Sequence, residues 1–379
     1  MSTLKATYLQ QASSASPNIT LDASTNATVA GTLAMGYSFK RNRIINGNML
    51  IDQRNAGASV TSISATYIVD RWMAFDSVGS KFTAQQNAGS VTPPVGFTNY
   101  LGATSTSSYS ITSSDQFNFQ QRIEGFNVSD LAWGTANAKT ITVSFWVYSS
   151  LTGTFGGSIL GASTRSYPFD YTISSSNTWT YITKTIPGDT SGTWNTNNGV
   201  GLRIYFSLGT GSTNSAASGS WLAGSYQSVT GATSVVGTNG ATFYITGVQL
   251  ETGSIATPYE RQIYSDQLAQ CQRYLPYFIN NSGSNSYPGL GSAGNTVTAY
   301  PYIPFPVFAR VAPTGVVSSG SFALTDAATT TVVTAIGINT ASNSAGLLNA
   351  SVASGLTAFR PYYFQFANGS YVYFTGCEL

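Results

Sequence analysis

The segment Lys139–Ser150, KTITVSFWVYSS, decides the fold because apolar side chains alternate with other side chains along it. The apolar set is Ile141, Val143, Phe145 and Val147, and the opposite set is Thr142, Ser144, Trp146 and Tyr148. Successive side chains of a β-strand point to opposite faces, so the segment predicts a strand with one buried and one wetter face.

The same alternation recurs at 199–208, and at 241–250 it shifts by one position at Gly247. A glycine at a phase shift indicates a β-bulge. Long antiparallel strands joined by Gly- and Ser-rich loops over residues 42–256 predict a two-sheet jelly-roll sandwich.

The composition agrees with an all-β fold. Only 8% of the 379 residues are charged, against about 25% in an average soluble protein, so Ser, Thr, Asn and Gln must supply the polar surface. The chain has no histidine, which removes the commonest general base and zinc ligand. We expect no cofactor. A structural calcium ion bound by Asp and Asn oxygens is an open alternative, but no Asp-x-Asp-x-Asp loop identifies its ligands.

Charge and hydropathy exclude further classes. The formal net charge is +2, and the one basic cluster, Lys40, Arg41 and Arg43, is interpreted as a solvated junction rather than a nucleic-acid site. We expect no secretory signal at the start of the chain and no membrane insertion, since no run of about 18 apolar residues occurs. Cys271 and Cys377 are expected to be buried free thiols.

The remaining segments complete the domain organisation. Residues 1–41 are expected to form an attachment or stem segment, with a disordered tail as the alternative. Residues 257–276 predict a connecting helix, in which Thr257 and Glu260 form a capping box and Pro276 ends the helix. Residues 280–379 predict a small C-terminal β domain, including a hairpin at Asn368-Gly369.

Five segments bracketing residues 42–313 resemble a module common in phage and prophage tail proteins. They are Arg43–Arg54 (RIINGNMLIDQR), Tyr67–Trp72 (YIVDRW), Ile245–Gly253 (ITGVQLETG), the run from Pro258 through Tyr274, and Phe305–Val307 with Arg310–Pro313. The resemblance implies a carbohydrate-binding-module-like jelly roll in a bacteriophage tail fibre, a homotrimer attached by its N-terminus.

The expected function is therefore a virion tail fibre, made in the host cytoplasm, that binds the host cell surface without catalysis. Its expected partners are two further copies of the chain, a phage tail or adaptor protein bound by the N-terminal segment, and a host surface glycan. A head- or collar-decorating fibre is one alternative. A polysaccharide depolymerase is another, in which Asp70 with Asp76, or Asp115 with Glu124, would supply paired carboxylates.

A sugar ring packs its C–H face on an aromatic ring, while its hydroxyls need polar partners. Trp146, Tyr148, Arg203 and Tyr205 lie opposite the apolar faces of their strands, and we expect them to form an aromatic platform with a cation. An inter-subunit surface is an equally weighted alternative, because aromatic residues and Arg are also enriched at interfaces.

Two further ligand-binding candidates are Asp70 and Trp72, from the segment YIVDRW. The alternative for them is a core tryptophan beside an internal ion pair of Asp70 with Arg71. The aromatic residues of 287–308 and 362–374 are a third candidate surface, because a distal C-terminal domain is a natural point of host contact.

Overall fold

The computed structural model describes residues 8–9, 19–21, 27–29, 40–61, 63–161, 164–326 and 328–379. The chain separates into two units, Met1–Arg41 and Asn42–Leu379. The first contains an antiparallel sheet of β1 (Tyr8–Leu9), β2 (Ile19–Leu21) and β3 (Ala27–Val29). The attachment segment expected at residues 1–41 falls mostly outside the described residues and stays a prediction.

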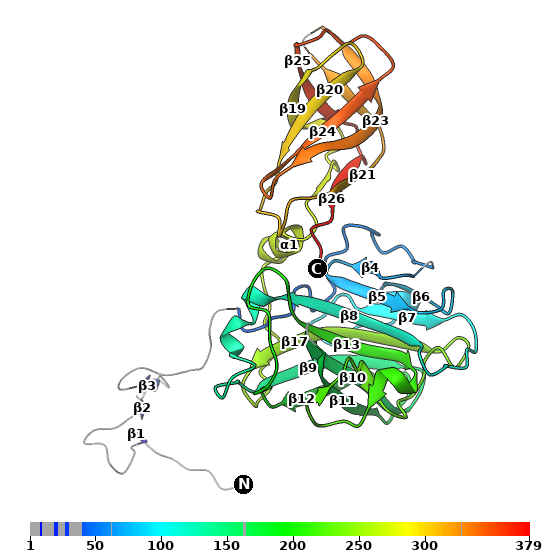
Figure 1. Cartoon of the computed structure of the whole chain (residues 1–379), viewed down its shortest axis with the longest axis vertical. Coiled ribbons are helices and arrows are strands. Elements are labelled where there is room, and N and C mark those ends of the chain that lie inside the picture. The colour runs from blue at the N-terminus through cyan, green and yellow to red at the C-terminus, as the bar shows by residue number, and fades with distance from the viewer. Residues whose placement is uncertain are drawn as a thin grey trace. The chain divides into compact units, whose positions relative to one another are not determined.

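The second unit contains a sandwich of two antiparallel sheets, in the lower part of Figure 1. Seven strands follow the order β15-β11-β10-β13-β8-β5-β4, and five follow the order β12-β9-β17-β7-β6. The seven strands are β4 (Thr66–Val69), β5 (Trp72–Asp76), β8 (Gln116–Glu124), β10 (Gly153–Gly161), β11 (Arg165–Ile173), β13 (Val200–Thr210) and β15 (Leu222–Ala223). The five strands are β6 (Phe82–Gln86), β7 (Leu101–Ser105), β9 (Ile141–Ser149), β12 (Thr180–Ile186) and β17 (Thr242–Thr252).

Short elements complete this part of the chain. A parallel pair is made by β14 (Ser215–Ala216) and β16 (Ser228–Val229). Single 3-10 turns are η1 (Ala88–Ser90), η2 (Gly125–Asn127), η3 (Ser129–Leu131) and η4 (Ser212–Asn214). The all-β, jelly-roll class predicted from the sequence is confirmed.

The apolar core lies between the two sheets. The alternation of β9 is confirmed, because its four inward side chains are 0% exposed: Ile141, Val143, Phe145 and Val147. From the other sheet, β13 buries Leu202, Ile204, Phe206 and Leu208. The rings of Phe145 and Phe206 meet edge to face with centroids 4.9 Å apart, a geometry worth about 0.5–1.5 kcal/mol beyond area burial.

The bulge expected in β17 is present. The register of β17 on β9 shifts between Thr246 and Gln249, and Gly247 between them has a φ of +61°. Glycine adopts this left-handed backbone without the steric cost that a Cβ would add. The bulge also shapes the outer surface of this sheet.

The described part of the chain has one α-helix, α1 (Tyr264–Gln272), so the helix expected over 257–276 is wrong in its bounds. Thr257 does not cap it. The backbone N–H and the hydroxyl of Thr257 donate instead to the two carboxylate oxygens of Glu251, at 2.8 and 2.7 Å. Tertiary hydrogen bonds to β17 therefore outweigh the local capping preference.

The C-terminal β domain is a closed barrel with a small sheet beside it (Figure 1). The barrel order is β19-β20-β24-β23-β22-β25, and closure leaves no free strand edge. Its strands are β19 (Ser286–Ala293), β20 (Thr298–Pro304), β22 (Phe322–Thr325), β23 (Thr330–Ala341), β24 (Ala345–Val352) and β25 (Pro361–Phe366). The second sheet has the order β18-β26-β21, with bounds Tyr277–Ile279, Tyr371–Thr375 and Gly315–Ser319.

The hairpin expected at Asn368-Gly369 is wrong, although strands flank it on both sides. β25 belongs to the barrel, whereas β26 pairs with β18 and β21. Of the two turn residues only Gly369 has a positive φ, while a type I′ turn needs two. Asn280 separates the strands by donating to the Phe366 carbonyl and accepting from the Gly369 N–H.

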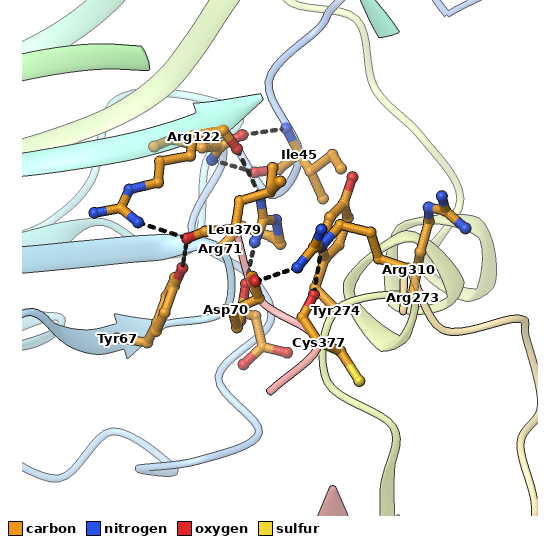
Figure 2. A network of polar contacts seen from close by, with 12 residues as sticks. Ile45, Tyr67, Asp70, Arg71, Arg122, Arg273, Tyr274, Arg310, Cys377 and Leu379 are labelled. Atoms are coloured by element: carbon orange, nitrogen blue, oxygen red, sulfur yellow. Dashed lines mark hydrogen bonds and ion pairs between the residues drawn. The ribbon is translucent and has the colours of Figure 1, made fainter. Parts of the chain in front are cut away.

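The end of the chain is bound into the sandwich by arginines (Figure 2). The Glu378 carboxylate pairs with Arg54 at 2.9 Å and also with Arg71. Arg122 Nη1 donates to the Leu379 carbonyl at 2.8 Å. Strands β4, β5 and β8 are thereby joined to the residues that follow β26.

The helix enters the same network from the other side (Figure 2). The guanidinium of Arg71 lies 3.6 Å from the centre of the Tyr274 ring. The Tyr274 hydroxyl donates to Glu124 at 2.7 Å, and Arg273 binds the same carboxylate through two hydrogen bonds. These partners lower the pKa of Glu124 against the opposing effect of desolvation.

Two further groups pack at this junction. Arg310 donates to the carbonyls of Cys377, at 2.8 Å, and Glu378, at 2.7 Å. Cys271 and Cys377 are free and buried, as expected from the sequence. Burial is the main reason that the pKa of the Cys271 thiol lies well above its usual range, which leaves it a neutral side chain.

We predict that Glu378→Ala lowers the free energy of unfolding by about 3 kcal/mol, because it leaves the buried Arg71 guanidinium without its counter-ion. Asp130→Ala is the control, since it breaks the more exposed Arg43–Asp130 pair and should cost about 0–1 kcal/mol. Urea denaturation measures both variants. Equal losses in the two would contradict the structural role of Glu378.

Candidate functional site

The outer face of the five-stranded sheet carries a row of aromatic side chains. Trp146 on β9 lies opposite Tyr181 on β12, with ring centroids 5.2 Å apart. Tyr181 is 42% exposed and Trp146 is half-buried. The period-2 alternation that buries Phe145 places these rings on the opposite, solvent-facing side.

These two rings line a pocket of about 450 Å³. Small-ligand pockets measure about 300–1,000 Å³. The lining residues come from four places: the loop before β7, β9, β12, and β17 with the segment that follows it. They are Phe97, Trp146, Tyr181, Gly247, Ala256, Thr257, Pro258, Tyr259 and Arg261. We call this pocket the aromatic groove.

The β17 bulge forms the floor of the aromatic groove. A Cβ on Gly247 would lie 2.6 Å from Phe97 Cζ and 3.2 Å from Trp146 Cδ1. A side chain at this position would therefore collide with the rings of both walls. Glycine at the bulge thus serves both the backbone conformation and the open volume.

The segment between β17 and α1 forms one wall, and hydrogen bonds fix it to the sandwich. Besides the bonds between Thr257 and Glu251, the Glu260 N–H donates to Gln249 Oε1 at 2.8 Å. The Glu260 carboxylate accepts from the Asn42 N–H at 2.7 Å. The residues expected to begin a helix therefore shape the groove instead.

The rim combines aromatic rings with one cation. The ring of Phe97 lies edge-on to Tyr259, with centroids 5.2 Å apart. The exposed guanidinium of Arg261 lies 5.0 Å from the centre of the Phe97 ring, within the range of a cation–π contact. Burial is the main cause that raises the pKa of Tyr259, so its phenol remains protonated.

Tyr148 lies on the same face as Trp146, but it belongs to a neighbouring cluster. Its ring stacks on Tyr244 at 5.2 Å with an interplanar angle of 9°, and it also contacts Trp179. Tyr100 completes the cluster. The cluster anchors the loops beside the groove, and Tyr148 does not line the groove itself.

Arg203 and Tyr205 lie in the other sheet, on β13, so the four-residue platform expected from the sequence is divided. Alternation correctly places all four opposite the apolar faces of their strands, but the outer faces of the two sheets point in opposite directions. Tyr205 is moreover only 3% exposed. Of the four expected residues, Trp146 alone lines the aromatic groove.

Asp70 and Trp72 lie inside the protein. Trp72 is 0% exposed, and its indole N–H donates to the Asn46 carbonyl at 3.0 Å. Asp70 accepts hydrogen bonds from the backbone and side chain of Gln53. The core alternative therefore describes Trp72 correctly, but the ion-pair partner of Arg71 is Glu378 rather than Asp70.

The two carboxylate pairs considered for catalysis are not brought together. Asp115 directly precedes β8 and Glu124 ends it, which places them about 30 Å apart at roughly 3.4 Å per residue. Asp70 precedes β5 and Asp76 ends it. Glu124 binds Arg273 and Tyr274, and Asp115 accepts from Thr112, Tyr109 and Ser77.

The described residues contain neither a metal-binding cluster nor a membrane-spanning helix. No group of three or more Cys, Asp or Glu side chains there is placed to hold a metal ion. Within the same residues, no helix has the length and apolar character needed to cross a membrane.

No protein-family model matches the sequence, and no curated protein matches it. Among solved structures, the chain is similar to the enzymatically active domain of tailspike protein 4 of bacteriophage CBA120, at 14% identity and TM-score 0.29. That match covers 56% of this chain and 22% of the tailspike chain.

Two binding proteins are also similar to this chain. A protein of Bacteroides thetaiotaomicron, described as sugar-binding, matches at 12% identity and TM-score 0.33, covering 56% of this chain and 100% of that one. A family 11 carbohydrate-binding module of Clostridium thermocellum matches at 15% identity and TM-score 0.27, covering 53% and 99%.

The buried Asp70 carboxyl should make the stability of the protein depend on pH. Burial is the main cause that raises its pKa to about 6, against the lowering effects of Arg54 and Gln53. The folded protein therefore binds a proton that the unfolded chain releases, so this group lowers stability as the pH rises from about 4 to about 6. Over that pH interval, the free energy of unfolding of the Asp70→Asn variant should fall by roughly 3 kcal/mol less than that of the wild type.

Urea denaturation at pH values across this interval measures the effect. Asp130→Asn, which removes a more exposed carboxylate, is the control and should keep the wild-type profile. If Asp70→Asn and the wild type have the same pH profile, the buried Asp70 carboxyl does not titrate as expected.

Proposed function

We propose that the protein is a virion tail fibre that recognises the host cell surface by binding a glycan in the aromatic groove. The observation that carries the proposal is the pairing of Trp146 and Tyr181 on an open face, with Arg261 at the rim. A sugar ring presents C–H groups that pack on such rings and hydroxyls that bind a guanidinium or backbone groups.

The composition of the groove favours binding over hydrolysis. Glycosidases use a pair of Asp or Glu residues placed about 5–10 Å apart, and the lining residues include neither type. Aromatic rings, one cation and backbone groups suit recognition of an uncharged or acidic saccharide. The proposed protein therefore acts without catalysis.

The tail-fibre assignment rests on the segments that resemble phage tail modules. The proposed fibre is a homotrimer whose residues 1–41 bind a phage tail or adaptor protein. Shallow grooves bind weakly one at a time, and three copies would raise the effective concentration of each groove near a surface that displays many copies of one glycan.

We predict that Trp146→Ala lowers binding to a responsive polysaccharide by about 30-fold, since truncating an aromatic hot spot costs about 2 kcal/mol or more. A microarray of bacterial surface polysaccharides identifies the ligand, and isothermal titration calorimetry then gives its affinity for each variant. Phe126→Ala, at an exposed aromatic outside the groove, is the control and should bind as the wild type does.

Retention of full affinity by both Trp146→Ala and Tyr181→Ala would refute the groove as the binding site. Light scattering on the same sample tests the trimer, and a monomer would refute the fibre assembly. Release of reducing ends from the bound polysaccharide would show that the protein is a depolymerase rather than a non-catalytic binding protein.

A further inference from the structure

The C-terminal barrel carries a second hollow that the aromatic groove does not include. It measures about 370 Å³ and is lined by Tyr287, Thr325, Asp326 and Tyr363. This volume lies at the lower end of the range of small-ligand pockets, about 300–1,000 Å³. The hollow is therefore suited to one or two small rings.

Two tyrosines give the hollow exposed aromatic faces. Tyr287 on β19 is 53% exposed and Tyr363 on β25 is 56% exposed. Their ring centroids lie 6.0 Å apart at an interplanar angle of 68°. The register of β19 on β25 shifts between Ser286 and Gly289, so Tyr287 lies within an irregularity of the kind that re-aims side chains.

The polar side of the hollow is held in place by its own hydrogen bonds. Asp326 Oδ1 accepts from the N–H groups of Ala328, at 2.8 Å, and Thr329, at 2.7 Å. These bonds, led by that from Ala328, lower the pKa of Asp326. The carboxylate is therefore ionised at neutral pH and can act only as an acceptor.

The other carboxylate oxygen lacks an aligned donor. Asp326 Oδ2 is buried without a hydrogen bond, although Arg360 Nε lies 2.8 Å away as an ion pair. The Arg360 side chain is 42% exposed. A ligand hydroxyl can therefore reach Oδ2 when Arg360 moves aside, and Arg360 can then bind the ligand as well.

We propose that this hollow is a second saccharide site, which binds one uncharged sugar residue against Tyr363. The ring stacks its C–H face on Tyr363 with Tyr287 at its edge, and adjacent hydroxyls bind Asp326 and Arg360. Asp326 and Arg360 balance each other in charge, so the site has no net charge to attract an acidic sugar. The site is independent of the aromatic groove.

A protein partner suits the hollow less well than a sugar. The outward row across the barrel continues from Tyr363 through Leu290 to Tyr302, which pair across the strands. Such a row alone would suit a second copy of the chain. The hollow at its end, with a carboxylate oxygen that pairs with Arg360 but accepts no hydrogen bond, instead suits a small ligand rich in hydroxyls.

Saturation-transfer NMR of the full chain tests this proposal with D-glucose, D-galactose, D-mannose, N-acetyl-D-glucosamine and L-rhamnose as probes. The experiment uses the Trp146→Ala background, so that the aromatic groove is disabled. We expect at least one probe to receive saturation, and Tyr363→Ala to lower its affinity at least tenfold. Asp326→Asn, which keeps the side-chain shape, should lower it by a similar factor.

Tyr302→Ala is the matched control, because Tyr302 is 51% exposed on the same wall but does not line the hollow. It should leave probe binding unchanged. Binding of no probe, or equal binding by Tyr363→Ala and the background, would overturn the proposal. A fall in the mass of both Tyr363→Ala and Tyr302→Ala by light scattering would identify the wall as a contact between copies instead.

Discussion

The buried pair of Arg71 with Glu378 is the interaction on which the arrangement of this protein depends. It joins the turn before β5 to the end of the chain, and through Tyr274 it reaches the helix. Two desolvated charges are costly unless each is well paired. A chain with only 8% charged residues therefore uses several of them inside this junction, while hydroxyl and amide groups serve its surface.

This network also explains what the segment YIVDRW does. Tyr67, Asp70, Arg71 and Trp72 all belong to the interior: Trp72 packs between the sheets, Arg71 binds Glu378, and Asp70 holds the Gln53 loop. One of the five segments that resemble tail modules is thus part of the interior. The proposed ligand groove lies elsewhere, although Gly247, Pro258, Tyr259 and Arg261 belong to two other segments that resemble tail modules.

Local patterns in the sequence predicted the strands well but not their partners. Alternation correctly placed Trp146 and Arg203 outward, yet only long-range pairing assigns β9 and β13 to different sheets. The capping box at Thr257 failed for a different reason, because Glu251, six residues earlier in the chain, accepts from both of its donors. Phe97, Tyr181 and Arg261 were missed, since they join Trp146 only through loops and strands distant in sequence. The local signals of the groove were the outward position of Trp146 and the phase shift at Gly247.

The junction bears on how the two proposed saccharide sites would work together. Linked sites raise avidity only when their spacing is maintained, since effective concentration depends on how the link constrains them. A flexible link between the sandwich and the barrel would lower this effective concentration and therefore the avidity. Here the link includes α1, Arg310 and the chain end, each hydrogen-bonded to the sandwich or to one another. The charges of this junction would thus contribute to binding indirectly, by holding the two sites in place, whereas Arg261 would contact the ligand itself.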